Sequence, residues 1–305
     1  MVATLIDGLL SLGCKVLLLG APGSQSDHPN IDVIDAGTPK EIKMWLASHP
    51  ADFDIVHDHS NGLVFQASDD PPFAYTATSH VSGASLCPKN VIYLSRAQRT
   101  YATSYSAPFI PIPCNPDRFI TSPVKENYFL FLGRVSAWKG VLEAAAFSAL
   151  CDTPLMIAGP TWEKVYAKKI SDRYGKHVQF VGELSGDSRL ELLSRSRALL
   201  ALSQSKRGPH VGLWVEPGAT VVSEAAASGT PVIGSTNGCL PEIVPPVGAV
   251  IPEGSSWSPS FCINVVAGLP SSQIVLEAAR ERWHYLVIAQ RYLQLYRLIC
   301  GGMQW

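Results

Sequence analysis

The sequence has little charge. Only 16% of its 305 residues are charged, and 24 Lys and Arg against 25 Asp and Glu leave a formal net charge of −1. Typical soluble domains carry about 25% charged residues. This balance argues against a surface for nucleic acid, because such surfaces are strongly basic. Residues 1–118 contain 7 basic and 11 acidic residues, which also argues against docking of this half on an anionic membrane.

Signals for disulfides, zinc and membranes are absent as well. The seven cysteines are odd in number and contain no C-x-x-C pair, so neither a disulfide framework nor a zinc knuckle is indicated. No run approaches the ~18 apolar residues of a membrane span, and the first residues lack the pattern of a signal peptide. We therefore expect a reduced, cytoplasmic protein without a transmembrane segment.

Length and proline distribution predict two domains. A chain of 305 residues is about twice the usual domain length. Prolines crowd residues 108–123 and interrupt any regular pattern, which is typical of a linker. We expect one domain over 1–118 and a second over 119–283. A last helical pattern runs over 273–299, and we expect it to break near 283–285.

Short apolar runs alternate with helical patterns in both halves. Uniformly apolar strands between helices are typical of a parallel sheet that is covered on both faces. We therefore expect an α/β fold with two Rossmann-like, doubly wound, parallel-sheet domains. The expected strands are 15–19, 31–34, 53–57, 73–77, 91–95 and 109–112 in the first domain, and 128–132, 155–158, 178–181, 198–202 and 231–234 in the second.

Two cations follow the first strand of the second domain. Arg134 and Lys139 lie in the glycine-bounded segment 133–140, where that strand turns into a helix. Ligands of open α/β sheets bind outside the carboxyl ends of the strands. A guanidinium and an ammonium at this place suit a diphosphate. The alternative is a solvated loop whose cations contact only water.

Two carboxylates with seven residues between them form a second candidate group. Pro217 favours the first helical position, which predicts a helix over 217–228 with Glu216 as its N-cap. Glu224, about two turns further, would share the face of Glu216. Glu216 could accept hydrogen bonds from sugar hydroxyls and Glu224 from a ribose. The alternative is a capping carboxylate and an unrelated surface Glu.

Backbone amides at the start of this helix would complete an anion site. The first N–H groups of a helix have no partner within it. We expect those of Gly218, Ala219 and Thr220 to face a bound sugar and phosphate.

These motifs, in this order and spacing, resemble the sugar-nucleotide half of the family 4 retaining glycosyltransferases, which have the GT-B fold. The first half and the end of the chain resemble the same family, whose terminal helix returns to the first domain; we expect residues 284–305 to do so here. The resemblance rests on residues 133–140, Glu216-x7-Glu224, 228–233, 238–243, 54–57, 77–80, 115–119 and 282–296.

The resemblance implies transfer of a sugar, with retention of anomeric configuration and without a metal, across a cleft between the two domains. Arg134, Lys139 and Gly133 would hold the diphosphate of a UDP-sugar or GDP-sugar donor. Glu216 would hold the transferred sugar and Glu224 the ribose. His80 would contact the sugar from the first domain. No cofactor is implied, and the acceptor stays open.

Some residues depart from the family or suggest a metal. The family has an aromatic residue and a Gly where Gly218 and Ala219 stand, which leaves the sugar open. The D-x-D match at 52–54 opens a buried strand and is interpreted as structural. Residues 57–59, His-Asp-His, alternate between the faces of a strand, so we expect no metal there.

Two other functions remain as alternatives. One is a catalytically silent subunit that binds a nucleotide sugar. The other is a sugar-nucleotide epimerase, which shares the two-domain architecture.

The chain begins within a predicted helix, whereas the family begins with a strand and a Gly-rich turn. In the strand order 3-2-1-4-5-6 the lacking strand is the central one, so strands 15–19 and 53–57 would share no neighbour. We expect either that the gene product extends upstream of Met1, or that the first sheet has rearranged or borrows a strand by exchange within an oligomer.

Overall fold

The computed structural model describes residues 1–206, 212–254 and 256–305. The chain divides into two compact units. The first contains Met1–Pro113 and His284–Trp305, and the second contains Cys114–Trp283. The division falls within the proline-rich passage, slightly before the residue 118 that the sequence predicts.

The second unit contains a six-stranded parallel sheet of order β11-β10-β9-β6-β7-β8. β6 lies inside the sheet, which explains why its side chains are almost uniformly apolar and buried. The strands are β6 (Phe129–Leu132), β7 (Leu155–Ala158), β8 (Val178–Gly182), β9 (Ala198–Ala201), β10 (Val232–Ser235) and β11 (Gly248–Ile251).

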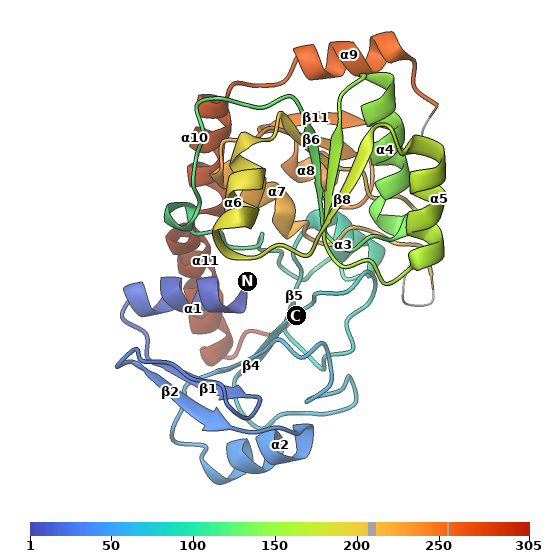
Figure 1. Ribbon diagram of the computed structural model, residues 1–305. Coiled ribbons are helices and arrows are strands. Elements are labelled where there is room, and N and C mark those ends of the chain that lie inside the picture. Colours follow the sequence, from blue (N-terminus) through green and yellow to red (C-terminus); the bar gives the residue numbers. More distant parts are fainter. Residues whose placement is uncertain (207–211, 255) are drawn as a thin grey trace. The chain divides into compact units, whose positions relative to one another are not determined.

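Helices cover both faces of this sheet. Phe129 and Phe131 pack toward one face and Leu130 toward the other, because successive side chains of a strand alternate. Figure 1 shows α4 and α5 on one side of the sheet and α6 and α7 on the other. The first face carries α4 (Val141–Leu150), α5 (Lys164–Tyr174) and α9 (Pro259–Ala267), and the second carries α6 (Gly186–Arg195), α7 (Thr220–Ala227), α8 (Leu240–Ile243) and α10 (Ser272–Trp283).

The first unit has two separate parallel sheets in the described residues. β1 (Val16–Gly20) pairs with β2 (Ile31–Asp35), while β4 (Tyr75–Thr78) lies between β3 (Val56–Asp58) and β5 (Val91–Ile92). As the sequence predicts, β1 and β3 share no neighbouring strand. The strand expected over 109–112 is reduced to one bridge between Tyr93 and Phe109.

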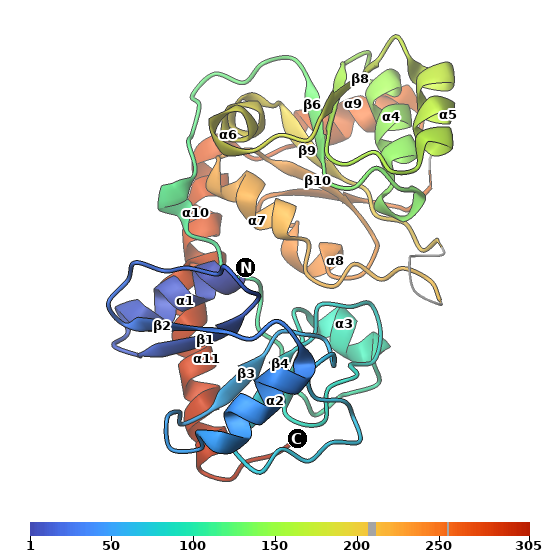
Figure 2. The same cartoon turned by 60° about the horizontal axis from the view of Figure 1, so that its bottom comes forward.

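Helices also lie on both sides of the first unit. α1 (Val2–Ser11) and α11 (Tyr285–Cys300) pack together in one apolar cluster, which includes Leu5, Ile288 and Tyr292. α2 (Pro39–Ser48) packs in another cluster with β3 and β4 (Figure 2). The remaining helices are α3 (Arg96–Tyr101) and two short 3-10 turns, η1 (Pro116–Arg118) and η2 (Ala137–Lys139).

The C-terminal helical pattern breaks where the sequence predicts. α10 ends at Trp283 and α11 begins at Tyr285. Among the described residues, no single helix has the length and apolar composition that crossing a membrane requires. α9 and α10 reach that length and composition only when taken together, and they are bent by 73° relative to each other.

Candidate functional site

Two loops meet where the strand order of the second unit reverses. The chain runs from β6 to β7 and β8 on one side, and then from β9 to β10 and β11 on the other. The segments after β6 and β9 therefore leave the carboxyl ends of adjacent parallel strands. Such a switch point is where open α/β sheets bind ligands.

An ion pair joins these two loops. Lys139 Nζ lies 2.9 Å from Oε1 and 2.7 Å from Oε2 of Glu216. Oε2 also accepts hydrogen bonds from the Ser203 hydroxyl at 2.6 Å and from the Trp214 indole N–H at 3.1 Å. The Glu216 side chain is 6% exposed, whereas that of Lys139 is 28% exposed. The carboxylate is thus a buried acceptor, and the ammonium reaches the surface.

The surroundings keep Glu216 ionised. Burial, the largest influence, raises the pKa of its carboxyl, but the Lys139 ammonium and the hydrogen bonds from Lys139, Ser203 and Trp214 outweigh it. The net result is a pKa below the usual value for Glu. Glu216 can therefore accept hydrogen bonds from hydroxyl groups at neutral pH.

Glycines bring the backbones of the site together. Gly140 has a positive φ of 72°, and a Cβ there would stand 1.7 Å from the carbonyl oxygen of Leu202. A Cβ on Gly238, with φ 54°, would stand 2.3–2.8 Å from backbone atoms of Glu216. Only Gly permits approaches this close.

Neighbours of Gly238 fix the backbone of Glu216 on both sides. The Glu216 N–H donates to Asn237 Oδ1 at 2.8 Å, and the Glu216 carbonyl accepts from the Cys239 N–H at 2.9 Å. Asn237 Nδ2 in turn donates to the Trp214 carbonyl at 3.1 Å. Residues that follow β10 therefore set the position of the carboxylate that follows β9.

Arg134 is the exposed cation of the site. It follows Gly133 after β6, and its guanidinium lies 4.6 Å from the centre of the Trp162 ring. Within the described ranges, no carboxylate forms an ion pair with it. A guanidinium supported by an aromatic face and open to solvent can take up an anion.

The start of α7 differs from the prediction. The helix begins at Thr220, and its N-cap is Ala219 rather than Glu216. Ala219 has φ 43° and ψ 66°, which is a left-handed conformation. The right-handed helix therefore does not extend to the residues before Ala219. Of the three amides proposed for the anion site, only that of Thr220 lies within the helix.

This change also separates the two carboxylates. The sequence predicts that Glu216 and Glu224 share one helix face. This prediction is wrong, because Glu216 lies before the first residue of α7. Glu224 instead forms an ion pair with Arg189 of α6. Burial raises the pKa of the Glu224 carboxyl, and Arg189 opposes this rise. A ribose hydroxyl would have to share Glu224 with this guanidinium.

His80 belongs to a stack of three histidines in the first unit. Its Nε2 lies 3.1 Å from Nδ1 of His59, whose ring lies 4.1 Å from that of His57. His57 is bonded through both nitrogens, to the hydroxyls of Tyr296 at 2.6 Å and Thr78 at 2.7 Å. Burial lowers the pKa of all three rings, for His59 to about 3. The stack is therefore uncharged at neutral pH.

The residues considered for a metal do not gather into a site. The Asp58 carboxylate is held by other groups. It accepts a hydrogen bond from the Tyr75 hydroxyl at 2.8 Å and another from the Ser60 N–H at 2.6 Å. Asp52 and Asp54 are exposed. No group of three His, Cys, Asp or Glu among the described residues is arranged to hold a metal ion.

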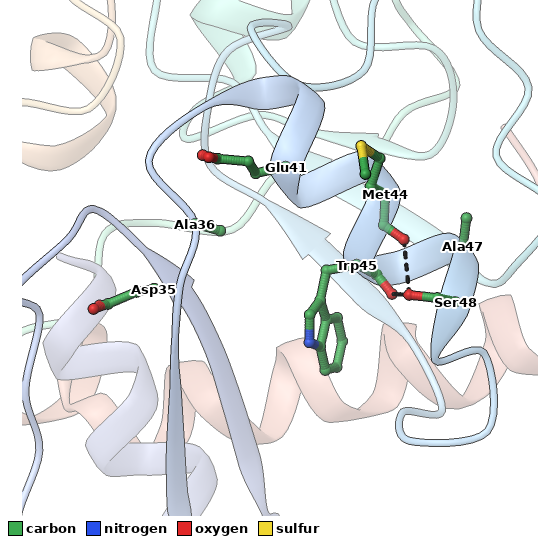
Figure 3. A pocket seen from close by; sticks show the side chains of 7 residues that line it. All are labelled: Asp35, Ala36, Glu41, Met44, Trp45, Ala47 and Ser48. Carbon is green, nitrogen blue, oxygen red and sulfur yellow. Dashed lines mark hydrogen bonds between the residues drawn. The ribbon is translucent and has the colours of Figure 1, made fainter.

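A surface depression beside α2 contains none of the predicted site residues. Figure 3 shows the Trp45 ring at this depression, and the Ser48 hydroxyl donating to the Met44 and Trp45 carbonyls within the helix. The depression is lined by Asp35, Ala36, Glu41, Met44, Trp45, Ala47 and Ser48.

Several contacts of the site were not predicted from the sequence. Ser203, Trp214 and Asn237 hold Glu216, and Arg189 holds Glu224. The Trp two residues before Glu216 was the available signal, because a Trp usually brings its N–H to a partner when it is buried. The others come from distant parts of the chain and give no local pattern.

The second unit matches a family of known enzymes. The family model described as "Glycosyl transferases group 1" matches residues 116–257. A mannosyltransferase of Corynebacterium glutamicum, GDP-mannose-dependent monoacylated alpha-(1-6)-phosphatidylinositol monomannoside mannosyltransferase, is 30% identical over 104 residues. That match spans 34% of this chain and only 26% of the mannosyltransferase.

Solved structures extend the match to the whole chain. AviGT4, a glycosyltransferase involved in Avilamycin A biosynthesis, is 47% identical with a TM-score of 0.93; the match covers 100% of this chain and 90% of AviGT4. Sucrose-phosphate synthase from Thermosynechococcus elongatus is 19% identical with a TM-score of 0.76, covering 99% of this chain and 93% of that one. The chain therefore belongs to the glycosyltransferases of the GT-B fold.

Proposed function

We propose that the protein transfers a hexose from a nucleotide-diphosphate sugar to an acceptor, with retention of anomeric configuration and without a metal. The observation that carries the proposal is the Lys139–Glu216 pair at the switch point, with Arg134 on the same loop as Lys139. It combines cations for a diphosphate with a buried carboxylate for sugar hydroxyls. The 47% identity to AviGT4 supports the reaction class.

Donor binding would exchange partners within the site. The diphosphate would take the Lys139 ammonium and the Arg134 guanidinium, since phosphate oxygens are strong acceptors for both. Glu216 would then accept hydrogen bonds from the sugar hydroxyls in place of Lys139. At the other end, Glu224 and its partner Arg189 would contact the ribose.

In the reaction, the bond from the anomeric carbon to the phosphate oxygen breaks, and its electrons stay on the diphosphate. The acceptor hydroxyl attacks the same face of the sugar and forms the new glycosidic bond, and its proton passes to the leaving phosphate oxygen on that face. The main task of the protein is to stabilise the charge on the leaving diphosphate, and Arg134 and Lys139 would do this without a metal ion. His80 stays a predicted contact of the sugar.

The donor and acceptor follow from the relatives as proposals. GDP-mannose is the donor in the name of the Corynebacterium relative, so GDP-sugars come first. UDP-sugars, the other donors expected from the sequence, come next. The acceptor panel should begin with intermediates of Avilamycin A biosynthesis, in which AviGT4 is involved, because the two chains match over nearly their whole lengths.

Binding tests the donor site before any acceptor is known. We expect a UDP-sugar or a GDP-sugar to raise the melting temperature, because a ligand at 100 times its Kd adds ~2.7 kcal/mol of stability. Arg134→Ala and Glu216→Gln should each weaken donor binding at least tenfold. Lys168→Ala, which removes an exposed pair with Asp172 on α5, is the matched control.

Transfer assays with the bound donor then test the chemistry. NMR of the product should show the anomeric configuration of the donor, and EDTA should leave the rate unchanged. An inverted product contradicts retention, and loss of activity in EDTA contradicts metal independence. Donor binding without transfer or hydrolysis would favour a silent binding subunit, and interconversion of donor sugars without acceptor would favour an epimerase.

A further inference from the structure

Trp214 contacts both charged groups of the donor site. Its indole N–H donates to Glu216 Oε2 at 3.1 Å, and the face of its ring lies 4.6 Å from Lys139 Nζ. Its main chain is held on both sides, since the N–H donates to the Lys206 carbonyl at 2.8 Å and the carbonyl accepts from Asn237 Nδ2 at 3.1 Å. The half-buried ring is therefore fixed against both the carboxylate and the ammonium.

The two oxygens of Glu216 have unequal surroundings. Oε2 accepts from Lys139, Ser203 and Trp214, whereas Oε1 accepts from Lys139 alone among the described residues. A carboxylate offers about four acceptor positions over its two oxygens. Oε2 is thus nearly saturated, and Oε1 keeps free capacity for a ligand.

This asymmetry would persist after a donor binds. If the diphosphate draws Lys139 away, Ser203 and Trp214 remain on Oε2 and prevent rotation of the carboxylate. Oε1 is then left without its protein partner. Meanwhile the Trp214 ring continues to support the ammonium through the negative face of its π system.

We propose that Trp214 is a positioning residue of the donor site, which directs Oε1 of Glu216 to the hydroxyls of the transferred sugar and supports the Lys139 ammonium with the face of its ring. This inference rests on the proposed function for its ligand. It goes further by assigning a role to a side chain that touches neither sugar nor phosphate in that proposal.

Trp214→Phe separates the two contacts, because Phe keeps an aromatic face and lacks the N–H. Nucleoside diphosphate alone should bind with little change, since its partners Arg134 and Lys139 remain. The sugar adds affinity, which calorimetry measures as the ratio of the Kd of GDP or UDP to the Kd of the corresponding nucleotide sugar. In Trp214→Phe this ratio should fall about tenfold. Trp257→Phe, whose ring packs against Phe147 in the same unit, is the matched control.

A second measurement requires no donor. The titration of the Glu216 carboxyl can be followed by carbon NMR of protein labelled at Glu, with the signal assigned by its loss in Glu216→Gln. Because a hydrogen bond to the ionised form lowers a carboxyl pKa, Trp214→Phe should raise the pKa of Glu216, and Trp257→Phe should leave it unchanged. The upward shift in Trp214→Phe is a readout that a purely structural role of the ring would not give.

The outcomes separate this inference from the proposed function. If no nucleotide or nucleotide sugar binds the unmodified protein, the proposed function fails, and the titration alone decides whether Trp214 holds Glu216. If the donor binds and Trp214→Phe leaves both the sugar-dependent affinity and the Glu216 pKa as they are in Trp257→Phe, the role of Trp214 is wrong.

Discussion

Lys139 Nζ contacts both carboxylate oxygens of Glu216, at 2.9 and 2.7 Å, although the two residues lie 77 positions apart in the sequence. The partners differ in exposure, since the Glu216 side chain is 6% exposed and the Lys139 side chain 28%. Loss of the cation would leave a buried charge, whereas loss of the carboxylate would leave an ammonium that reaches water.

The first prediction concerns this unequal exposure. Lys139→Met should cost about 3–5 kcal/mol of the free energy of unfolding, because it leaves a buried carboxylate unpaired. Glu216→Gln should cost less, and adding it to Lys139→Met should recover part of the loss. Urea unfolding measures all three. The exposed pair Lys168–Asp172 provides the control, where Lys168→Met should cost below about 1 kcal/mol. Equal costs at Lys139 and Lys168 would contradict the prediction.

The second prediction concerns the conformation of Ala219. A left-handed conformation costs a non-Gly residue about 1–2 kcal/mol, and the greater freedom of Gly in the unfolded chain offsets about half of this. Ala219→Gly should therefore raise the free energy of unfolding by about 0.5–1 kcal/mol. Ala225→Gly, inside the same helix, should lower it by about 1 kcal/mol. Thermal or urea unfolding compares them, and a shift of the same sign in both would refute the strain at Ala219.

The third prediction uses two glycines with similar φ and different surroundings. Gly238→Ala should displace the Glu216 backbone, because the new Cβ would stand 2.3–2.8 Å from it. At Gly182, φ is 77° and nothing lies within 4 Å of a Cβ. Gly182→Ala should therefore cost only about 1–2 kcal/mol of stability and leave donor binding intact. Gly238→Ala should lose more stability and also weaken donor binding; calorimetry with both variants checks the difference.

The fourth prediction is a pH dependence from the histidine stack. Burial, followed by the neighbouring His80, lowers the pKa of His59 to about 3, whereas the ordinary value is 6.5. Below pH 6.5 His59 therefore binds a proton in the unfolded chain and stays unprotonated in the folded chain. The free energy of unfolding therefore falls as the pH falls. Each such histidine contributes a slope of up to about 1.4 kcal/mol per pH unit.

The variant His59→Gln tests this slope. It should flatten the dependence of the free energy of unfolding between pH 6.5 and 5, above the range where most carboxylates titrate. His28→Gln changes an exposed histidine whose Nδ1 accepts from the Asn30 N–H in the same loop, so it should keep the slope of the unmodified protein. An unchanged slope in His59→Gln would show that His59 takes up its proton in the folded state.

The sequence predicted much of the fold because burial leaves a local pattern. Strands β6, β7 and β8 begin and end within about a residue of the predicted ranges, since a continuous apolar run marks a strand covered on both faces. The break at 283–285 was predicted as well. α9 (Pro259–Ala267) was not, because the apolar run in this helix shows little periodicity that would separate it from a loop or a strand.

The candidate site was predicted in its residue types and not in its contacts. Residues 133–140 and 216–224 indicated the cations and carboxylates from their place after strands. The helix expected from Pro217 begins three residues later at Thr220, because Ala219 adopts a left-handed conformation. Pro at a first helical position is only a preference, and the left-handed Ala219 sets the helix start here.

The sequence by itself determined the α/β class, the division near the proline-rich passage and the charged residues after β6 and β9. These follow from local composition and period, which depend only on neighbours along the chain. The tertiary structure alone decided that Lys139 pairs with Glu216, that Arg189 pairs with Glu224 and that Trp214 contacts both members of the first pair. The physical reason is the strand order: β6 and β9 become neighbours only when the sheet forms, and their loops then place distant side chains in contact.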